Sequence, residues 1–272
     1  GENNAIMDAS PIVILHELDW VDYEPQWFIM GSPETEMGRG GDEYQHDVEI
    51  SYPFTIMKTE VTENIYAAVM GDIYISECWD CGYGGISWHD AAYFANLLSI
   101  LENREACYSC QYDWQAEQIY CAYDSEPFEC LGYRLPTEAE WEKASRGTHG
   151  LKFPWSNKFL EKRANLSGQA DGFEFMAPVG SFPMGRSVYG VYDMSGNVSE
   201  WVSDIYDQFY YQSAPMMNPT GPDKGKNRVY RGGSWDSRSV DIRTSKRFAA
   251  TEGRKDAVLG FRCGLSKADL EE

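Results

Sequence analysis

Residues 190–201 read GVYDMSGNVSEW, and they lie in a half of the chain where regular structure is sparse. From about residue 148 onward, glycine, asparagine, proline and aromatic residues dominate, and few apolar residues recur at helical spacing. Short strands are predicted at residues 228–231 and 260–263, among long loops. Such loops need bound metal ions or side-chain hydrogen bonds to become ordered, and we expect one or both here.

The first half of the chain carries clearer helix and strand signals. Thr62 can cap a short helix, and Ser87 begins a longer one that runs to about residue 102, with apolar residues at helical spacing. Thr137 and Glu140 form a capping box at the start of a third helix. Two or three short helices among many short strands predict an irregular α+β domain. The strands predicted in this half cover residues 27–30, 48–50 and 54–57.

Composition limits the classes of partner. The 272 residues include 23 Lys and Arg against 43 Asp and Glu, a formal net charge of −20. Nucleic acid and anionic lipid both need a basic face, so no nucleic-acid partner is expected and docking on anionic lipid is disfavoured. No apolar run approaches the ~18 residues of a membrane span, so no direct membrane insertion is expected. Surplus carboxylate is compatible with hard cations, cationic partners or work outside a cell.

The cysteines allow two interpretations. The first is three disulfides that hold a loop-rich insertion together in an oxidising compartment. The second is a structural zinc ion bound by two Cys-x-x-Cys pairs, which is the less favoured. The seventh cysteine, Cys263, is expected to be a buried small apolar residue. The six disulfide candidates, whose connectivity the sequence does not choose, are Cys78, Cys81, Cys107, Cys110, Cys121 and Cys130.

Eight short strings together resemble one family, the sulfatase-modifying-factor or formylglycine-generating-enzyme domain family. They are FIMGS (28–32), EVT (60–62), ISWHDA (86–91), YRLPTEAEWE (133–142), APVG (177–180), GVYDMSGNVSEW (190–201), RGGSW (231–235) and GFR (260–262). The resemblance implies an irregular single domain related to C-type lectins, a fold that hosts both enzymes and binders. It divides the chain into an N-terminal extension (1–24), the domain (25–266) with a cysteine-rich insertion (76–131), and a tail (267–272).

The same resemblance implies one or two calcium sites in the loops. Asn- and Gly-rich loops supply the side-chain and carbonyl oxygens that a hard cation requires. The alternative is an ordinary loop closed by Asx-turns. The first site would use two side chains and two carbonyls, from Asn165, Asp171, Leu166 and Phe173. The second would use two carboxylates and two carbonyls, from Asp193, Glu200, Gly196 and Val198.

Oxidation chemistry is not expected. The resemblance implies that the oxidases of this family hold copper and a substrate cysteine with two cysteines shortly after the Gly-Gly-Ser-aromatic string. Residues 235–243 contain no cysteine. A serine oxygen cannot replace a thiolate ligand of Cu(I), so copper is not expected and no catalytic residue is assigned.

The segment after Trp235 is a candidate binding surface. In lectin-like relatives this segment lines an exposed groove, and a plain solvated surface is the alternative. Arg243 and Arg247 lie four residues apart and can instead pair with buried carboxylates. Elsewhere, His89 in the first turn of its helix is expected to be solvated or to cap it. The groove would be formed by Trp235, Asp236, Arg238, Asp241, Arg243 and Arg247.

The interpretation that follows is a non-oxidase, calcium-ordered, disulfide-bonded domain that acts in recognition or assembly. A secreted, periplasmic or cell-surface location is expected, although residues 1–4 show no signal pattern. Two alternatives remain open: an enzyme, such as an oxidoreductase, with a different catalytic set, and a retroelement-diversified ligand-binding protein. The sequence does not identify the ligand, which could be a protein, a small molecule or a glycan.

Overall fold

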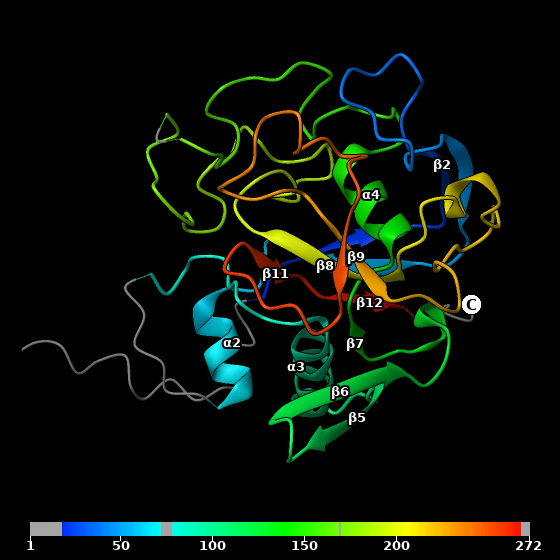
Figure 1. The fold of residues 1–272 in the computed structure, drawn as a ribbon, viewed down its shortest axis with the longest axis vertical. Helices are drawn as coiled ribbons and strands as arrows, with labels where there is room; N and C mark the ends of the chain where they lie inside the picture. The colour runs from blue at the N-terminus through cyan, green and yellow to red at the C-terminus, as the bar shows by residue number, and fades with distance from the viewer. Residues whose placement is uncertain (1–17, 72–77, 169, 268–272) are drawn as a thin grey trace, which may run out of the picture.

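Two four-stranded sheets form the centre of the molecule (Figure 1). The computed structural model describes residues 18–71, 78–168 and 170–267. The first sheet is antiparallel throughout and has the order β1 (Trp20–Tyr23), β4 (Phe54–Met57), β12 (Gly264–Ser266) and β7 (Tyr133–Arg134). In the second, β11 runs parallel to β8, and the order is β10 (Phe248–Thr251), β9 (Asn227–Arg231), β8 (Ser199–Ile205) and β11 (Leu259–Phe261).

Among the described residues there are also two β-hairpins and two short 3-10 helices. One hairpin pairs β2 with β3, and the other pairs β5 with β6. The architecture is the irregular α+β domain that the sequence predicts. The strand β1 lies in the segment expected as an extension, whereas residues 1–17 and 268–272 are outside the described residues. The bounds are β2 (Gln26–Met30), β3 (His46–Ile50), β5 (Tyr108–Asp113), β6 (Gln118–Tyr123), η1 (Pro127–Glu129) and η2 (Tyr210–Gln212).

Each of the three α-helices within the described residues begins at the capping residue that the sequence indicates. The Thr62 hydroxyl accepts a hydrogen bond from a first-turn amide, and Ser87 and Thr137 each form a capping box. The first helix ends at Gly71, whose φ of 75° is a left-handed conformation that glycine adopts without strain. The helices are α2 (Glu63–Met70), α3 (Trp88–Leu101) and α4 (Glu138–Arg146).

Helix α4 is buried along its whole length although most of its residues are charged or polar. Its carboxylates pair with guanidinium groups from both sheets: Glu140 with Arg134 of β7 at 2.6 Å, and Glu138 with Arg231 of β9 at 3.2 Å. Buried charges persist only when such partners satisfy them, because an unpaired ion would cost several kcal/mol. These ion pairs therefore fix α4 against both sheets.

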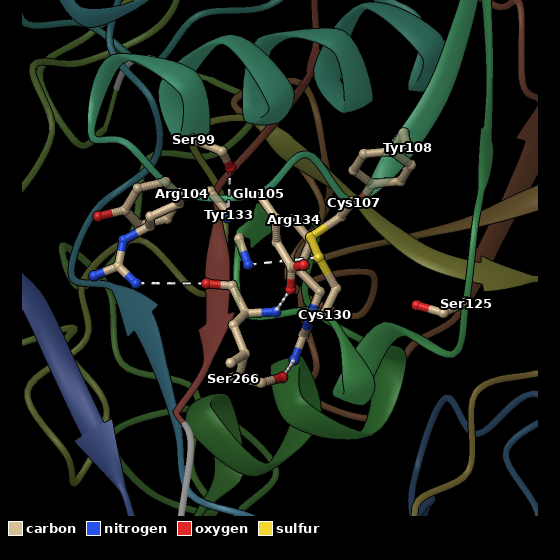
Figure 2. Close-up of a disulfide and its surroundings, with 12 residues drawn as sticks. Ser99, Arg104, Glu105, Cys107, Tyr108, Ser125, Cys130, Tyr133, Arg134 and Ser266 are labelled. Atoms are coloured by element: carbon tan, nitrogen blue, oxygen red, sulfur yellow. Dashed lines mark hydrogen bonds between the residues drawn. A yellow bond between two sulfur atoms is a disulfide. The ribbon is translucent and has the colours of Figure 1, made fainter.

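The cysteine-rich insertion contains three disulfides, as predicted, so the zinc interpretation is wrong. Cys78 bonds to Cys81, Cys107 to Cys130, and Cys110 to Cys121, which uses all of the cysteines a zinc ribbon would need. Figure 2 shows the Cys107–Cys130 bond beside α3, where the Ser99 hydroxyl accepts a hydrogen bond from the Tyr133 amide at 2.7 Å. The insertion is thus fastened to the domain core.

His89 differs from its prediction. It is buried, and its Nδ1 accepts a hydrogen bond from the Cys121 amide at 3.1 Å. The helix presents His89 to the β5–β6 hairpin, which the sequence did not place there. A structural role in packing the insertion on α3 replaces the expected solvated or capping role.

The long loops of the second half gather at one end of the molecule, away from the β5–β6 hairpin (Figure 1). The amide of Ser167 donates to the carbonyl of Ser237 at 3.0 Å, which joins the 165–180 loop to the segment after Trp235. We call these two segments the loop platform, residues 165–180 and 232–241. No helix within the described residues has the length and apolar character to cross a bilayer.

Candidate functional site

Asn197 is the junction of the loop platform. Its side-chain oxygen accepts from Asn165 Nδ2 at 3.1 Å and from the Ala177 amide at 2.8 Å, and its Nδ2 donates to Glu60 at 2.5 Å. Its carbonyl accepts from the Trp235 amide at 2.8 Å. Because Asn197 is buried, each of these groups would be costly to leave unpaired. One residue, through its side chain and its carbonyl, thus joins both predicted calcium loops to the segment at Trp235.

The residues of the first predicted calcium site do come together. The amides of Leu166 and Phe173 donate to the Asp171 carboxylate at 2.7 and 3.1 Å. Beside them, Asn165 is buried, and its Nδ2 donates to the Phe175 carbonyl at 2.8 Å. Asn165 Oδ1 is buried and has no hydrogen-bond partner among the described residues. A buried oxygen without a donor leaves an acceptor unsatisfied, and a hard cation could fill that position.

The second predicted site fits a cation less well. Glu200 accepts two hydrogen bonds from Arg262, at 2.6 and 2.8 Å, and one from Trp141 at 2.8 Å. The Asp193 carboxylate accepts from the Gly180 amide at 2.7 Å. Arg262 already supplies the positive charge that Glu200 requires, so Glu200 is an ion-pair partner in this arrangement.

The backbone nevertheless brings the two predicted sites into contact. Gly196 has a φ of +87°, and a Cβ built on it would lie 2.2 Å from the Asn165 carbonyl oxygen. Only glycine allows this approach. No group of three or more His, Cys, Asp or Glu side chains with metal-binding geometry exists among the described residues, so both predicted sites would need amide or carbonyl oxygens besides their carboxylates. The calcium ligands remain predictions.

Four of the six predicted groove residues lie at the surface of the loop platform. Asp236 and Arg238 are exposed, Asp241 is half-buried, and Arg238 pairs with Asp241 at 2.9 Å. Trp235 is half-buried, and its indole meets the exposed ring of Phe175 edge to face at 5.3 Å. Its Nε1 is buried and has no partner among the described residues.

Phe175 was absent from the sequence-based site. It contacts Trp235 although the two residues lie in loops that are far apart in the sequence. No periodicity or motif connects them. The aromatic pair adds an apolar element to a surface that the sequence describes as polar.

Arg243 and Arg247 are not groove residues in the structure. Arg243 is fully buried and donates to Glu43 at 2.7 and 2.8 Å and to Glu36 at 2.7 Å. Arg247 is buried and forms a bidentate pair with Glu138 at 2.8 and 2.9 Å. The alternative in which both guanidinium groups pair with buried carboxylates therefore describes them, and a ligand on the platform cannot reach them.

The loop platform contains no thiol. Cys263 is the single free cysteine of the seven, and it is fully buried between β11 and β12. Burial raises the pKa of its thiol well above the usual range, which disfavours the thiolate. Cys263 is therefore the buried small apolar residue that the sequence predicts.

A separate polar cleft of about 200 Å³ lies between the cysteine-rich insertion and the adjoining ends of β8 and β9. Its lining includes Glu126, Asp223 and Arg228. The Arg228 guanidinium stacks on the Trp88 ring at 3.9 Å and donates to the Ser203 carbonyl at 2.8 Å. None of the six predicted groove residues lines this cleft, so it is distinct from the loop platform.

Comparison with known proteins finds relatives over most of the domain. The model of the "Sulfatase-modifying factor enzyme 1-like domain" family matches residues 25–267. The chain is 39% identical over 145 residues to serine/threonine-protein kinase Pkn1 of Chlamydia trachomatis, a match that covers 52% of this chain and 22% of that protein. It is 38% identical over 168 residues to the formylglycine-generating enzyme of Mus musculus, covering 55% and 42% of the two chains.

A further relative carries a different description. The inactive Cα-formylglycine-generating enzyme 2 of Mus musculus is 37% identical over 175 residues, covering 58% of this chain and 49% of that protein. The matched stretch spans less than half the length of each of these curated relatives. Active and inactive relatives therefore match this chain almost equally well.

Solved structures agree with the family over nearly the whole chain. Treponema denticola variable protein 1 superposes with a TM-score of 0.75 at 25% identity, covering 91% of this chain and 95% of that one. PvdO from Pseudomonas aeruginosa superposes with a TM-score of 0.74 at 27% identity, covering 91% and 94%. The fold and the matched family model agree, and the chain belongs to the sulfatase-modifying-factor, or formylglycine-generating-enzyme, family.

Proposed function

We propose that this protein is a non-oxidase member of its family that acts in ligand recognition or assembly through the loop platform. The observation that carries the proposal is the lack of a thiol on that platform: residues 235–243 contain no cysteine, and the free thiol of Cys263 is buried. A copper-dependent oxidation of a substrate cysteine needs soft sulfur ligands at the reacting centre. The exposed Asp236 and Arg238 beside Trp235 instead offer polar and aromatic contacts to a ligand.

Calcium would order the platform at the first predicted site. Asn165 Oδ1 and the Asp171 carboxylate would bind the ion together with the carbonyls of Leu166 and Phe173. The ion would satisfy the orphaned amide oxygen and would hold the 165–180 loop against Asn197. The second predicted site has weaker support, because Arg262 already neutralises Glu200.

We also infer that the domain works in an oxidising compartment, either secreted, periplasmic or at the cell surface. Three disulfides support this inference, because the cytosol keeps most protein thiols reduced. The ligand of the loop platform would be a protein, a small molecule or a glycan.

An oxidation assay tests the non-oxidase proposal. A cysteine-containing sulfatase peptide is incubated with the full protein, copper and oxygen, and aldehyde product is trapped with an oxime-forming reagent and detected by mass spectrometry. A formylglycine-generating enzyme serves as the positive control. The peptide is expected to remain unchanged, and trapped formylglycine above the no-enzyme background would overturn the proposal.

Calcium binding is tested separately by thermal unfolding after thorough chelation and re-addition of calcium. A ligand present at 100 times its Kd stabilises by about 2.7 kcal/mol, which corresponds to roughly 5–10 °C for a domain of this size. Asp171→Asn is expected to reduce the shift, whereas Asp236→Asn, which changes an exposed carboxylate on the same platform, should preserve it. An unchanged melting temperature in the wild type would remove calcium from the proposal.

A further inference from the structure

The β5–β6 hairpin is a rigid arm at the end of the molecule remote from the loop platform (Figure 1). Cys110 and Cys121 face each other across the two strands and form a disulfide. At its base, Asn96 of α3 donates to the Tyr108 carbonyl at 2.6 Å and accepts from the Cys107 amide at 3.0 Å. The disulfide therefore braces the hairpin internally, and hydrogen bonds from Asn96 fix its base to α3.

The outer part of this arm exposes large aromatic side chains. Trp114 is 84% exposed, Tyr112 is 47% exposed and Tyr120 is 45% exposed. The carboxylate of Asp113 accepts hydrogen bonds from the amides of Gln115 and Ala116, which hold the tip. Rigid exposed aromatic residues lose little conformational entropy when they are buried by a partner, and they are enriched among the residues that dominate binding energy.

The two rings at the tip form a corner. The centroids of Tyr112 and Trp114 are 4.7 Å apart, and the ring planes meet at 69°. Rings at this angle do not make one flat platform on which a sugar ring could stack across both. A corner of electron-rich faces suits a compact cation, which is attracted to the ring quadrupole, most strongly to that of tryptophan.

The segment that carries this corner has ionisable side chains of a single sign. Residues 105–133 contain no Lys, Arg or His. Anionic lipid would be repelled by this surface, and a cationic group would be attracted to it. The segment contains six carboxylates, all exposed: Glu105, Asp113, Glu117, Asp124, Glu126 and Glu129.

We propose that the Tyr112–Trp114 corner is a docking surface for a Lys- or Arg-rich segment of a protein partner. A basic side chain enters the corner and contacts the two rings, and neighbouring basic residues pair with Asp113 and Glu117. This surface is independent of the proposed role of the loop platform, because the two lie at different ends of the molecule (Figure 1).

Fluorescence anisotropy with fluorescein-labelled octa-arginine and octa-lysine peptides tests the proposal on the full chain at 0.15 M salt. Trp114→Ala is expected to weaken binding about fivefold, the effect of one exposed cation–π contact. Trp27→Ala is the matched control, because Trp27 is also exposed, at 64%, but lies on β2. It removes an exposed indole without changing net charge and is expected to leave the affinity unchanged.

Two further measurements distinguish specific binding at the Tyr112–Trp114 corner from general electrostatic attraction between a basic peptide and an acidic protein. Glu117→Gln is expected to weaken binding further, and an octa-glutamate peptide should not bind. Equal affinities of wild type, Trp114→Ala and Trp27→Ala would overturn the proposal, as would no measurable binding of either basic peptide. Trp114-dependent binding of chitohexaose or of phosphatidylserine vesicles, without binding of the peptides, would also overturn it.

Discussion

Replacement of Arg243 by alanine tests whether this residue supports the fold and does not bind ligand. The change removes the partner of two carboxylates, Glu43, which is fully buried, and Glu36, whose side chain is 7% exposed. Breaking a buried ion pair by removing one partner costs about 3–5 kcal/mol. A domain of this size loses roughly 2–4 °C of melting temperature for each kcal/mol, so the variant should melt about 6–20 °C lower.

The stability lost in the Arg243→Ala variant should also depend on pH. Burial raises the pKa of Glu43, but the hydrogen bonds and positive charge of Arg243, with hydrogen bonds from Gly40 and Ser32, together bring that pKa below the usual range. The pair therefore contributes stability above the unfolded-state pKa of a glutamate, and this stability is lost as the pH falls through the folded-state pKa. In the variant, Glu43 can take up a proton at acidic pH, so the difference from wild type should be largest at pH 7 and smaller near pH 4.

Thermal unfolding followed by circular dichroism at both pH values measures the effect. The matched control is Arg238→Ala, since Arg238 has 78% of its side chain exposed and its surface pair with Asp241 contributes at most about 1 kcal/mol. A melting temperature of Arg243→Ala within 2 °C of wild type at pH 7, or an equal loss in the control, would refute the structural role of Arg243.

Two other predictions concern stability. A disulfide that closes a longer loop removes more conformational entropy from the unfolded chain and should therefore stabilise more. In urea unfolding, removing the bond between Cys107 and Cys130, which lie 23 residues apart, should cost about 3 kcal/mol, against about 2 kcal/mol for the Cys78–Cys81 bond. Equal costs would contradict this dependence on loop length. Burial, with repulsion from Glu138, raises the pKa of Asp204 to about 7, so its contribution to stability falls as the pH rises from about 4 to 7, by roughly 4 kcal/mol. Asp204→Asn should flatten that part of the stability–pH curve, and an unchanged curve would exclude Asp204 as its origin.

The helices and the family could be predicted from the sequence because their signals are local. Thr62, Ser87 and Thr137 each cap the helix predicted to begin there, since the bonds of a capping residue reach only the first turn. The predicted bounds of the strands were less exact than those of the helices. The strand predicted at residues 260–263 ends at Phe261, and Cys263 lies between β11 and β12.

Parts of the candidate site needed three-dimensional information. The sequence placed Arg243 and Arg247 near Trp235, but their partners Glu43 and Glu138 lie 200 and 109 residues away, so only the folded chain shows that they are occupied. His89 was misplaced for the same reason, because the hairpin that covers it pairs through long-range contacts. The orphaned oxygen of Asn165 is likewise visible only once its surroundings are known.

The first sheet has a consequence for how such a domain can be joined to other proteins. Strands β1 and β12 flank β4 on opposite sides and run parallel to each other. Two strand spacings and the length of β4 put the start of β1 and the end of β12 on the order of 14 Å apart. A short flexible connector could link residue 267 to residue 18 and permit circular permutation with new termini in an exposed loop, and a host protein could carry the domain as an insert with little distortion of its own backbone.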